Sequence, residues 1–570
     1  MPRQPIYTIT ANCQDCYRCV RECPVKAIRI SGGQAQIDEE LCITCGICVR
    51  ECPQNAKTVR NDLNQAKELV NSKRMVAASV APSFAAVFPG PLSRRLPSAL
   101  RRLGFRFVCE TAEGAKYITE KSFAHSGTGG ITTACPVVVS LVEKYYPDYI
   151  DALIPVVSPM IAHGKMLKEK YPECAVVFIG PCAAKKHELL AEENKGAIDV
   201  AITFAELGEW LAAEGFLLEH CIESDFDNFY QIGDARLFPI QGGMLKTGAV
   251  ANDGTQTDVL HVSGADEVID LFKGSFSFEN KMVEPLFCKG GCINTPCIED
   301  LYAREKVGNL YTRRENLIRY ANAAKRKESN LPAVEVCHNM SYVNRKHAEA
   351  KVPTAQIQKI LESTGKVDKV YQLNCGACGY KTCYECATAI ARGMAEAEMC
   401  IPYMRRLAQQ RTDRILDTTP NGVVILDSEL LMTKMNPAFQ KMFMCNNGIL
   451  GRRISYLINA QGFELLQSGA MEKYESVQTK YGIKYLEKVY ALREDKQYVG
   501  IYTNITDIKY DINQLDAIKA QTLTHAREFL DHQLRFAQEM AHYLGKSTAQ
   551  SEEIAMRLIA LYERDGGEAP

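Results

Sequence analysis

The residues with the clearest chemistry are cysteines, and the stretch from 286 to 297 shows why. It reads Leu-Phe-Cys-Lys-Gly-Gly-Cys-Ile-Asn-Thr-Pro-Cys, so Cys288 and Cys292 stand four residues apart with two glycines between them. Glycine has no Cβ and adopts backbone angles that other residues avoid, so such a loop can approach a bulky group closely. Two thiolates turned toward one object are what an inorganic cluster requires. Taken alone, the stretch is equally compatible with an ordinary glycine-rich turn.

The composition is that of a large globular protein. At 570 residues the chain has room for three or four domains. The net charge of −1 provides no basic surface for nucleic acid or an acidic membrane. The sequence shows neither an apolar signal core nor a run long enough to cross a bilayer, so we expect a cytoplasmic protein with no membrane partner. Its 23 cysteines lie in tight groups, which in a cytosolic chain indicates metal sites rather than disulfides.

Two runs near the start of the chain repeat one cysteine pattern, C-x2-C-x2-C-x3-C-P. This spacing is typical of bacterial two-cluster ferredoxins, in which the fourth cysteine of each run binds the other cluster. Residues 1–60 are therefore predicted to be a ferredoxin domain that relays electrons through two [4Fe–4S] clusters. Two structural zinc sites are the less favoured alternative, because zinc sites rarely use eight cysteines with a proline after each run. The predicted ligands are Cys13, Cys16, Cys19 and Cys52 for one cluster, and Cys42, Cys45, Cys48 and Cys23 for the other.

After a short helical linker, apolar runs alternate with amphipathic stretches. The runs at 75–80, 175–180 and 199–203 are β-rich, and an amphipathic stretch at 205–214 follows the last of them. This alternation predicts a mostly parallel α/β sheet, in which sites form at the carboxyl ends of the strands. We expect one such domain over residues 75–330.

Two turns of this domain carry one cysteine each. One reads T-T-A-C-P and contains Cys135, and the other reads G-P-C-A-A-K-K-H-E and contains Cys182. With Cys288 and Cys292 they supply four thiolates, which is enough for a third cubane. Loops of the forms T-x-x-C-P, P-C-x-x-K-x-x-E and C-x-G-G-C, in this order behind a double ferredoxin, resemble those of an [FeFe]-hydrogenase. The resemblance covers roughly residues 1–330.

The resemblance implies the H-cluster, a [4Fe–4S] cubane joined to a diiron subsite with CO, cyanide and azadithiolate ligands. Cys135, Cys182, Cys288 and Cys292 would hold the cubane, and Cys292 would also bridge to the diiron subsite. Lys185 matches the lysine that pairs with one cyanide, since an anion in a dry pocket needs a charged donor. Taken without Cys182, Lys185 would be a solvated surface lysine.

Other pocket positions of the family are carried over in the same way. Pro82 and Ser83 match the early loop that contacts the other cyanide, and Ser158 lies in a further matching pocket segment. Glu188 lies one turn beyond the lysine. These residues are predicted to bind the cofactor.

Several positions depart from the family pattern. Productive hydrogenases have a cysteine that passes protons just before the first cubane ligand, and this chain has Ala134, whose methyl group cannot carry a proton. Lys121 and Ser122 stand where an acidic relay is expected. Gly180 and Leu286 replace two methionines. Retained cluster ligands with an interrupted proton path resemble the sensory type of [FeFe]-hydrogenase.

A third cysteine group lies beyond the hydrogenase-like region. It begins C-G-A-C-G-Y-K-T-C and resembles a small four-cysteine [4Fe–4S] module, which we expect over residues 335–405. Cys386, one helical turn after Cys383, competes with the other four for a ligand position. Tetrahedral zinc is the alternative metal, because four cysteines also suit that ion. The predicted ligands are Cys375, Cys378, Cys383 and Cys400.

The C-terminal part is nearly free of cysteines. Residues 408–508 resemble a PAS domain, and Cys445 within it is interpreted as a packed thiol rather than a metal ligand. Residues 511–565 have the composition of helices and are predicted to form a dimerising signal tail. The fold class is therefore multidomain α/β and α+β, with a ferredoxin, an H-cluster domain, an iron–sulfur module, a PAS domain and terminal helices.

These expectations combine into one function. The chain is predicted to bind H2 and to split or form it slowly, as an H2:ferredoxin oxidoreductase of low turnover whose main task is sensing hydrogen or redox state. Its cofactors would be the H-cluster and three further [4Fe–4S] clusters. Its partners would be H2, protons, a ferredoxin-like electron partner, a downstream kinase or phosphatase, and a second copy of the chain. A ferredoxin-coupled catalytic hydrogenase with another proton route is the alternative.

Overall fold

The computed structural model describes most of the chain up to residue 506 and divides it into two compact units, Met1–Ile401 and Pro402–Pro570. Each unit is considered by itself below. The first contains the three regions that carry the cysteine groups. The tail predicted at 511–565 lies outside the described residues, which are 4–72, 74–125, 129–248, 258–274, 276–298, 308–325, 335–348, 351–492 and 496–506.

The N-terminal region is built from two similar halves. Each half has a short helix that contains its third cysteine, α1 (Arg18–Glu22) with Cys19 and α2 (Ile47–Arg50) with Cys48. Strand β1 (Ile6–Thr8) pairs antiparallel with β4 (Lys57–Val59), so the two ends of the region meet. The hairpin of β2 (Ile28–Ser31) and β3 (Gln34–Ile37) separates the halves. This arrangement agrees with the ferredoxin prediction.

The backbone repeats the symmetry of the sequence. Three pairs of residues with positive φ stand at the same sequence separation from matching cysteines of the two halves. They are Asp15 and Thr44, Tyr17 and Gly46, and Lys26 and Asn55. A left-handed residue turns the next backbone N–H sharply inward. Each loop therefore curls around a centre that its cysteines share.

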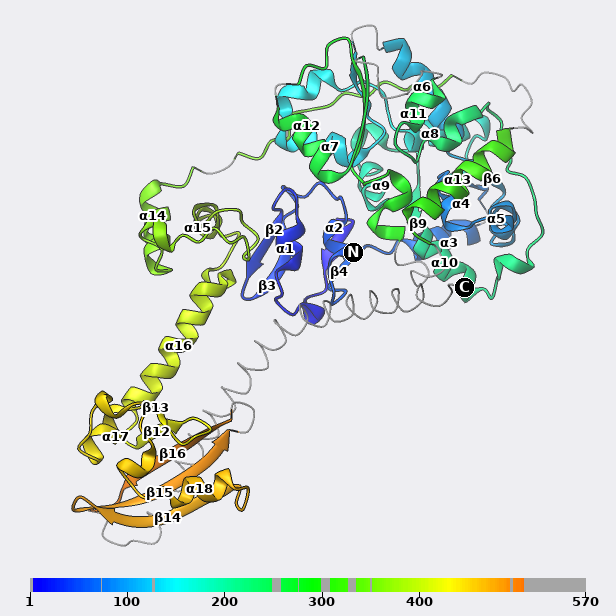
Figure 1. Ribbon diagram of the computed structural model, residues 1–570. Coiled ribbons are helices and arrows are strands. Elements are labelled where there is room, and N and C mark those ends of the chain that lie inside the picture. Colours follow the sequence, from blue (N-terminus) through cyan, green and yellow to red (C-terminus); the bar gives the residue numbers. More distant parts are fainter. Residues whose placement is uncertain are drawn as a thin grey trace, which may run out of the picture. The chain divides into compact units, whose positions relative to one another are not determined.

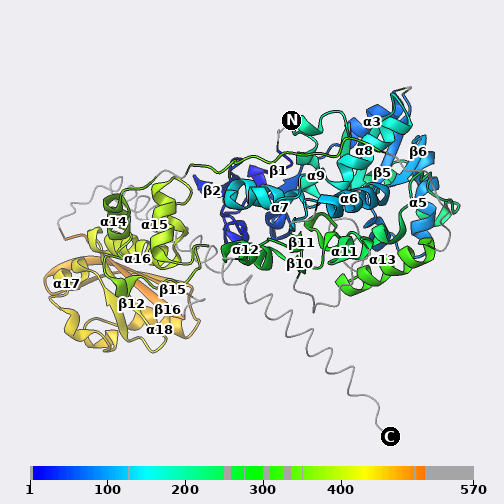
Figure 2. The same cartoon turned by 90° about the horizontal axis from the view of Figure 1, so that it is seen from above.

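The next region contains two separate parallel sheets (Figures 1 and 2). The larger has the order β6-β5-β8-β9, from β5 (Val76–Val80), β6 (Phe107–Glu110), β8 (Ala175–Gly180) and β9 (Val200–Thr203). The smaller has the order β10-β11-β7, from β7 (Gly130–Ile131), β10 (Val259–Ser263) and β11 (Met282–Leu286). The β-rich runs expected from the sequence form β5, β8 and β9, and all strand pairs in both sheets are parallel.

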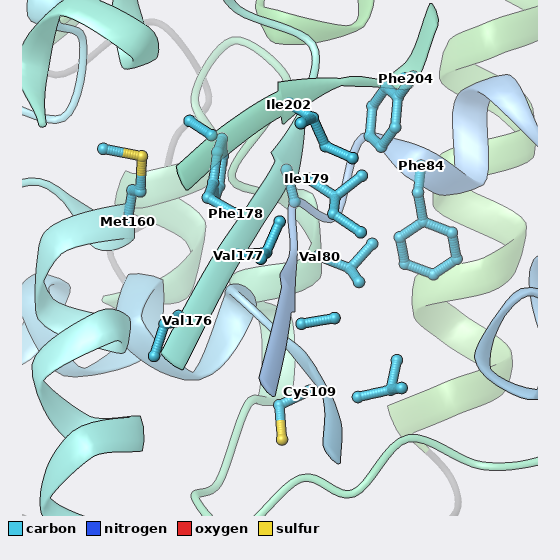
Figure 3. Packing of buried hydrophobic residues seen from close by; sticks show 14 of the residues in the cluster. Val80, Phe84, Cys109, Met160, Val176, Val177, Phe178, Ile179, Ile202 and Phe204 are labelled. Carbon is cyan, nitrogen blue, oxygen red and sulfur yellow. The ribbon is translucent and has the colours of Figure 1, made fainter. Parts of the chain in front are cut away.

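Helices cover both faces of the larger sheet, as expected for strands that are apolar on both sides. Ile179 and Val80, on neighbouring strands, point toward Phe84, whereas Phe178 points to the other face, where Met160 lies (Figure 3). The helices of this region are α3 (Leu63–Asn71), α4 (Phe84–Val87), α5 (Pro91–Arg102), α6 (Ala112–His125), α7 (Pro136–Tyr145), α8 (Pro159–Lys170), α9 (Ala183–Glu188), α10 (Phe204–Ala213), α11 (Gly243–Thr247), α12 (Ala265–Lys273) and α13 (Leu310–Lys325).

The four-cysteine region is small and helical. Helix α14 (Thr354–Ser363) packs against α15 (Cys383–Ala391) through Ile357, Leu361 and Ala387. Thr382 caps α15 by accepting a hydrogen bond from the N–H of Glu385, which fixes the turn before Cys383. Helix α16 (Ile401–Thr418) begins at the residue after Cys400.

The second unit contains one antiparallel sheet of five strands, in the order β13-β12-β16-β15-β14. Asn436 fixes the start of α17, because its side-chain oxygen accepts from the N–H groups of Phe439 and Val423. The strands and helices are β12 (Gly422–Leu426), β13 (Met432–Met435), α17 (Pro437–Met442), α18 (Gln461–Gln467), β14 (Lys473–Lys480), β15 (Ile483–Leu492) and β16 (Gln497–Asn504).

Among the described residues, no helix is both long enough and apolar enough to cross a bilayer.

Candidate active site and iron–sulfur centres

A cavity of about 100 Å³ lies where the two parallel sheets meet, at the carboxyl ends of their strands. Strand β8 ends at Gly180 and leads to Cys182, and β7 leads through three residues to Cys135. Strand β11, the neighbour of β7, leads to Cys288 and Cys292. Loops at this edge of parallel strands commonly form sites, and here three of them converge. All four cysteines line the cavity.

Two local features fix the cysteine loops. Thr133 donates its hydroxyl to the carbonyl oxygens of Ile154 (3.2 Å) and Val156 (2.9 Å), which anchors the loop before Cys135. Gly291 has a φ of 98°, and a Cβ there would lie 2.2 Å from the carbonyl oxygen of Pro239. The glycine pair in this loop is therefore required by backbone packing as well as by its left-handed conformation.

The cavity is a place where thiols remain protonated unless a metal binds them. Burial, followed by the charge of Cys135, raises the pKa of Cys182 to about 11. Burial likewise raises the pKa values of Cys288 and Cys292 above the ordinary thiol value. Iron binds the thiolate form, so binding of a cluster would offset the cost of burying this charge.

Two adjacent lysines of α9 point in different directions and have different partners. Lys186 is buried and forms ion pairs with Glu206 (2.7 Å) and Asp62 (3.1 Å), which ties α9 to α10 and to the linker. Lys185 lines the cavity, where its Nζ donates to the carboxylate of Glu188 (2.7 Å) and to the carbonyl oxygen of Ala134 (3.3 Å). The buried ion pairs of one lysine thus hold the other lysine in the cavity wall.

The chemistry of the cavity fits the H-cluster that the sequence resemblance implies. Four thiols face it, and among the described residues no three Cys, His, Asp or Glu side chains converge closely enough to hold a single metal ion. The hydroxyl of Ser83 lines the cavity, is buried, and lacks a hydrogen-bond partner within the described structure. The hydroxyl of Ser158 is also buried without a partner there, and it precedes the lining residue Pro159. A buried orphan donor and a partly buried cation at the cavity wall suit an anionic ligand such as cyanide.

The structure brings most of the predicted site residues together. Pro82, Ser83, Lys185 and Ala134 line the cavity with the four cysteines, whereas Ser158 and Glu188 are not among its lining residues. Glu188 contacts the site only through Lys185.

Several residues of the cavity wall were not predicted to lie there, among them Cys45, Thr111 and Cys297. The spacing pattern assigned Cys45 to the ferredoxin domain, and nothing in the sequence indicated that this domain would contact the cavity. Gly46 packs against Pro296, since a Cβ at Gly46 would lie 3.3 Å from the proline ring. The ferredoxin domain therefore forms part of the cavity wall.

A chain of buried polar groups starts at the cavity wall. The hydroxyls of Thr111 and Ser79 are 2.8 Å apart, and Ser79 is 2.8 Å from His163 Nδ1. His163 Nε2 is 3.1 Å from a carboxylate oxygen of Glu113, and burial raises the pKa of this carboxyl group. The other oxygen of Glu113 accepts from the backbone N–H groups of Phe229 and Tyr230. The chain can hold a proton near the cavity, and its last side chain is fully buried.

The ferredoxin cysteines fall into the two groups expected from the sequence. Cys52 lies with Cys13, Cys16 and Cys19, close enough to affect the ionisation of Cys19. Cys23 lies with Cys42, Cys45 and Cys48 in the same way. The sulfurs of Cys23 and Cys52 accept hydrogen bonds from backbone N–H groups four residues later, at 3.3 and 3.2 Å. N–H groups aimed at sulfur stabilise the thiolate form.

One buried lysine lies near both groups of ferredoxin cysteines. Lys57 is almost inaccessible and donates to the hydroxyl of Thr8 (2.5 Å) and the carbonyl oxygen of Ala35 (2.6 Å). Its charge opposes the effect of burial on Cys19 of one group and Cys48 of the other. The sequence offered no signal for this role, because Lys57 resembles any lysine in a short strand.

The cysteines of the small module gather around a lysine, with one exception. Cys400 contacts the side chain of Lys366, and Cys383 and Cys386 lie close enough to affect the ionisation of that lysine. Cys378 forms a side-chain hydrogen bond with Cys386. Cys375 is exposed at the start of its loop. The structure thus places the competing residue Cys386 inside the group, and the choice between Cys375 and Cys386 needs an experiment.

We expect Cys375→Ser to remove the module cluster and Cys386→Ser to retain it. The spacing of Cys375, Cys378, Cys383 and Cys400 is the one that resembles a four-cysteine cluster module, and Cys400 directly precedes α16. Cys386 is buried beside Cys378 and is the competing ligand. Iron per chain and the electron paramagnetic resonance (EPR) signal of the reduced module would be measured for both variants. Loss of the cluster from Cys386→Ser alone would exchange the two assignments, and stoichiometric zinc in wild-type protein would replace iron altogether.

Comparison with known families agrees with this geometry. Residues 74–296, which contain both parallel sheets and all four cavity cysteines, match the family described as iron only hydrogenase large subunit, C-terminal domain. This part of the chain is similar to [FeFe]-hydrogenases. Residues 35–58 match the family described as 4Fe-4S binding domain, and residues 372–402 match the family described as putative Fe-S cluster. Matches to iron–sulfur families therefore flank the hydrogenase match on both sides.

Curated relatives match parts of the chain. Iron hydrogenase 1 of Clostridium pasteurianum is 24% identical over 292 residues, which are 41% of this chain and 51% of that protein. The NADP-reducing hydrogenase subunit HndD of Solidesulfovibrio fructosivorans is 26% identical over 214 residues, 31% of this chain and 37% of that protein. The cytosolic Fe-S cluster assembly factor NAR1 of Vanderwaltozyma polyspora is 33% identical over 114 residues, 20% of this chain and 22% of that protein. The chain thus matches about half, or less, of the length of these relatives.

Solved structures match parts of the chain at low identity and low TM-score. A variant of the [FeFe]-hydrogenase HydA1 from Chlamydomonas reinhardtii is 20% identical, with a TM-score of 0.35, and covers 50% of this chain and 100% of its own. The PAS domain of an HTR-like protein from Haloarcula marismortui is 16% identical, with a TM-score of 0.15, and covers 18% of this chain and 99% of its own.

Proposed function

We propose that this protein is a PAS-linked [FeFe]-hydrogenase that binds H2 at an H-cluster and splits or forms it slowly, chiefly to sense hydrogen or redox state. The observation that carries the proposal is the cavity itself, which combines four thiols, a partly buried lysine and the orphan hydroxyl of Ser83 with a methyl group, Ala134, at the proton-transfer position. When bound, the H-cluster supplies the iron site at which H2 is cleaved heterolytically.

Each residue of the cavity would have a distinct role. Cys135, Cys182, Cys288 and Cys292 would hold the cubane, and Cys292 would join it to the diiron subsite. Lys185 would donate to one cyanide, replacing part of its present bond to Glu188, and Ser83 would donate to the other. With the ferredoxin and module clusters, the loaded protein would contain four cubanes in total.

The low turnover in this proposal follows from the proton path. A positioned group that accepts a proton accelerates such a step by about 10²–10⁴-fold, and Ala134 supplies none. The buried chain from Thr111 through Ser79 and His163 ends at Glu113, which is inaccessible to solvent, so a proton placed there is held rather than exported. A few turnovers are sufficient for a sensor.

The same polar chain also supports a second candidate, a ferredoxin-coupled catalytic hydrogenase with a non-standard proton route. In that case Thr111→Val should lower H2 turnover by at least about tenfold, within the range for general acid–base groups. If Thr111→Val leaves turnover unchanged, the chain has no part in proton transfer and the sensor proposal is favoured.

The second unit would be the output. Its five-stranded antiparallel sheet supports the PAS assignment made from sequence, and a PAS domain binds partners or changes conformation without catalysis of its own. We propose a separate kinase or phosphatase, and a second copy of this chain, as its partners. A ferredoxin-like protein would exchange electrons with the N-terminal domain.

Infrared spectroscopy under H2 and under argon, combined with hydrogen exchange over residues 408–506, tests this function. We expect CO and cyanide bands in matured protein, a shift of these bands under H2, and a change of amide protection in the second unit. A coupling of about 1–3 kcal/mol would give a several-fold change in partner affinity. Bands that shift while protection stays constant would favour the catalytic hydrogenase. Iron without CO or cyanide bands would indicate a protein that carries cubanes only.

A further inference from the structure

The small four-cysteine module packs against the ferredoxin domain within the first unit. One apolar cluster contains buried residues of both. We call this contact the docking face. On the ferredoxin side it comprises Cys19, Val20, Cys23, Ala27, Ile28, Ile30 and Ala35, and on the module side Tyr380, Cys386, Ala389, Ala395 and Met399.

Hydrogen bonds border the docking face on both sides. The carboxylate of Glu396 accepts from the backbone N–H groups of Gly32 (2.7 Å) and Gly33 (3.2 Å), at the tip of the β2–β3 hairpin. The N–H of Ile30 donates to the carbonyl oxygen of Met394 at 3.0 Å. These bonds join backbone to backbone and carboxylate to backbone, so they fix the angle of approach as well as the contact.

A glycine allows the two backbones to approach closely. Gly379 has a φ of 91°, and a Cβ there would lie 3.1 Å from both the N–H nitrogen of Arg21 and a methyl carbon of Val20. Gly379 follows Cys378 directly, so the module presents a predicted ligand loop, rather than a remote surface, to helix α1. A contact of this kind brings metal centres near one another.

The cysteines on either side of the docking face belong to different predicted clusters. Cys23 is buried in the shared apolar cluster, and Cys378 packs against the same cluster from the module. Cys23 shares its group with Cys45, and Cys45 lines the hydrogenase cavity. The group of Cys23, Cys42, Cys45 and Cys48 thus lies between the cavity and the module.

We propose that the docking face is an electron-transfer interface, which holds Cys378 of the module against Cys23 of the ferredoxin domain so that electrons from the cavity reach the module. The inference rests on the proposed function and adds a branch to its electron route. Oxidation of one H2 would break the H–H bond and yield two electrons and two protons, which the buried polar chain or water would take up. One oxidised [4Fe–4S] group held by the module and one held by the ferredoxin domain would each accept one electron.

The module is suited to report this electron to the second unit. Its ligand Cys400 directly precedes helix α16, and Lys366 contacts Cys400. At the other end of α16, the side-chain amide of Asn436 donates to the carbonyl oxygen of Leu416 (2.9 Å) and to that of Asn421 (2.8 Å). A change in the charge of a cluster held by Cys400 would therefore act on the N-terminal end of α16.

The test weakens the docking face without changing any ligand. Glu396→Ala removes the bonds to the hairpin, Ala395→Glu places a charge in the apolar cluster, and Glu398→Ala, two residues away and exposed, is the matched control. A charge-assisted hydrogen bond contributes about tenfold or more to an equilibrium, so amide protection at Gly32 and Gly33 should fall about tenfold in Glu396→Ala. Freeze-quenched EPR under H2 then follows reduction of the module in full-length protein.

We expect the module of Glu396→Ala and Ala395→Glu to be reduced about tenfold more slowly under H2 than that of wild type or Glu398→Ala, in proportion to the lost docking. Dithionite should reduce all four proteins to the same spin count, which shows that the clusters are intact. Lost protection with an unchanged rate of reduction would overturn the inference, and so would unchanged protection in Ala395→Glu.

Failure of the proposed function gives a different result. If no cluster of wild-type protein is reduced under H2, the hydrogenase proposal fails, while dithionite-reduced samples still test the docking face. Spin–spin broadening of the module signal, present in wild type and lost in Ala395→Glu, would support the interface. An unbroadened wild-type signal would overturn it.

Discussion

Ala134→Cys is expected to raise H2 turnover by at least about tenfold, because a positioned proton-transfer group contributes about 10²–10⁴-fold. Ala134 lines the cavity directly before Cys135, and its carbonyl oxygen already accepts a hydrogen bond from Lys185. A thiol at this position would therefore point into the space that the diiron subsite is proposed to fill. H2 evolution with a chemical reductant and H2 oxidation with a dye would be measured on matured protein with equal iron content.

Two further variants show whether a gain in turnover comes from the thiol and from the buried polar chain. Ala134→Ser adds a side chain of similar shape with a much less acidic proton, so it should gain far less than the thiol. Thr111→Val in the Ala134→Cys background tests whether the new thiol uses the buried chain at the other side of the cavity. If Ala134→Cys gains nothing, the missing acidic groups or the altered pocket at Gly180 and Leu286 limit the rate.

Cys292→Ser is expected to eliminate the diiron subsite completely, with loss of all CO and cyanide infrared bands. Cys292 is partly buried in the cavity wall, beside Cys288 and Cys182, and is proposed to be the only covalent link between the cubane and the diiron subsite. A serine hydroxyl is a poor ligand for iron and has no charge at neutral pH. Infrared spectroscopy and iron analysis after maturation would follow the change, and turnover should vanish with the bands.

Cys297→Ser is the matched control for that variant. Cys297 lines the same cavity, is more deeply buried than Cys292, and lies on the same loop five residues later. Because no cluster position is assigned to it, its replacement should leave the infrared bands and the iron content unchanged. Bands that persist in Cys292→Ser would refute the ligand assignment, and bands lost from both variants would indicate a collapsed loop rather than a missing ligand.

The sequence by itself determined which residues could bind metal and how they are grouped within each loop. The C-x2-C-x2-C-x3-C-P repeats predicted two groups that exchange their fourth cysteine, because that spacing is typical of bacterial two-cluster ferredoxins. The apolar runs predicted β5, β8 and β9, since strands buried on both faces must be apolar throughout. The departure at Ala134 was visible for the same reason, because it is a property of one position.

Only the tertiary structure decided which loops meet. Cys135 and Cys288 follow neighbouring strands, β7 and β11, whose pairing joins residues more than 150 positions apart and leaves no trace in spacing. Neighbouring lysines on α9 received opposite roles because their side chains leave the helix about 100° apart, so Lys186 meets Glu206 and Lys185 meets the cavity.

The same holds for contacts between the regions. Spacing alone predicted the module as a separate domain at 335–405, whereas its contact with the ferredoxin domain depends on Glu396 meeting two N–H groups of a hairpin more than 350 residues earlier. Local pattern reflects the conformational preference and burial of a segment, and it therefore reports on loops and strands. Contacts between segments depend on the shapes of both surfaces, which exist only after each region has folded.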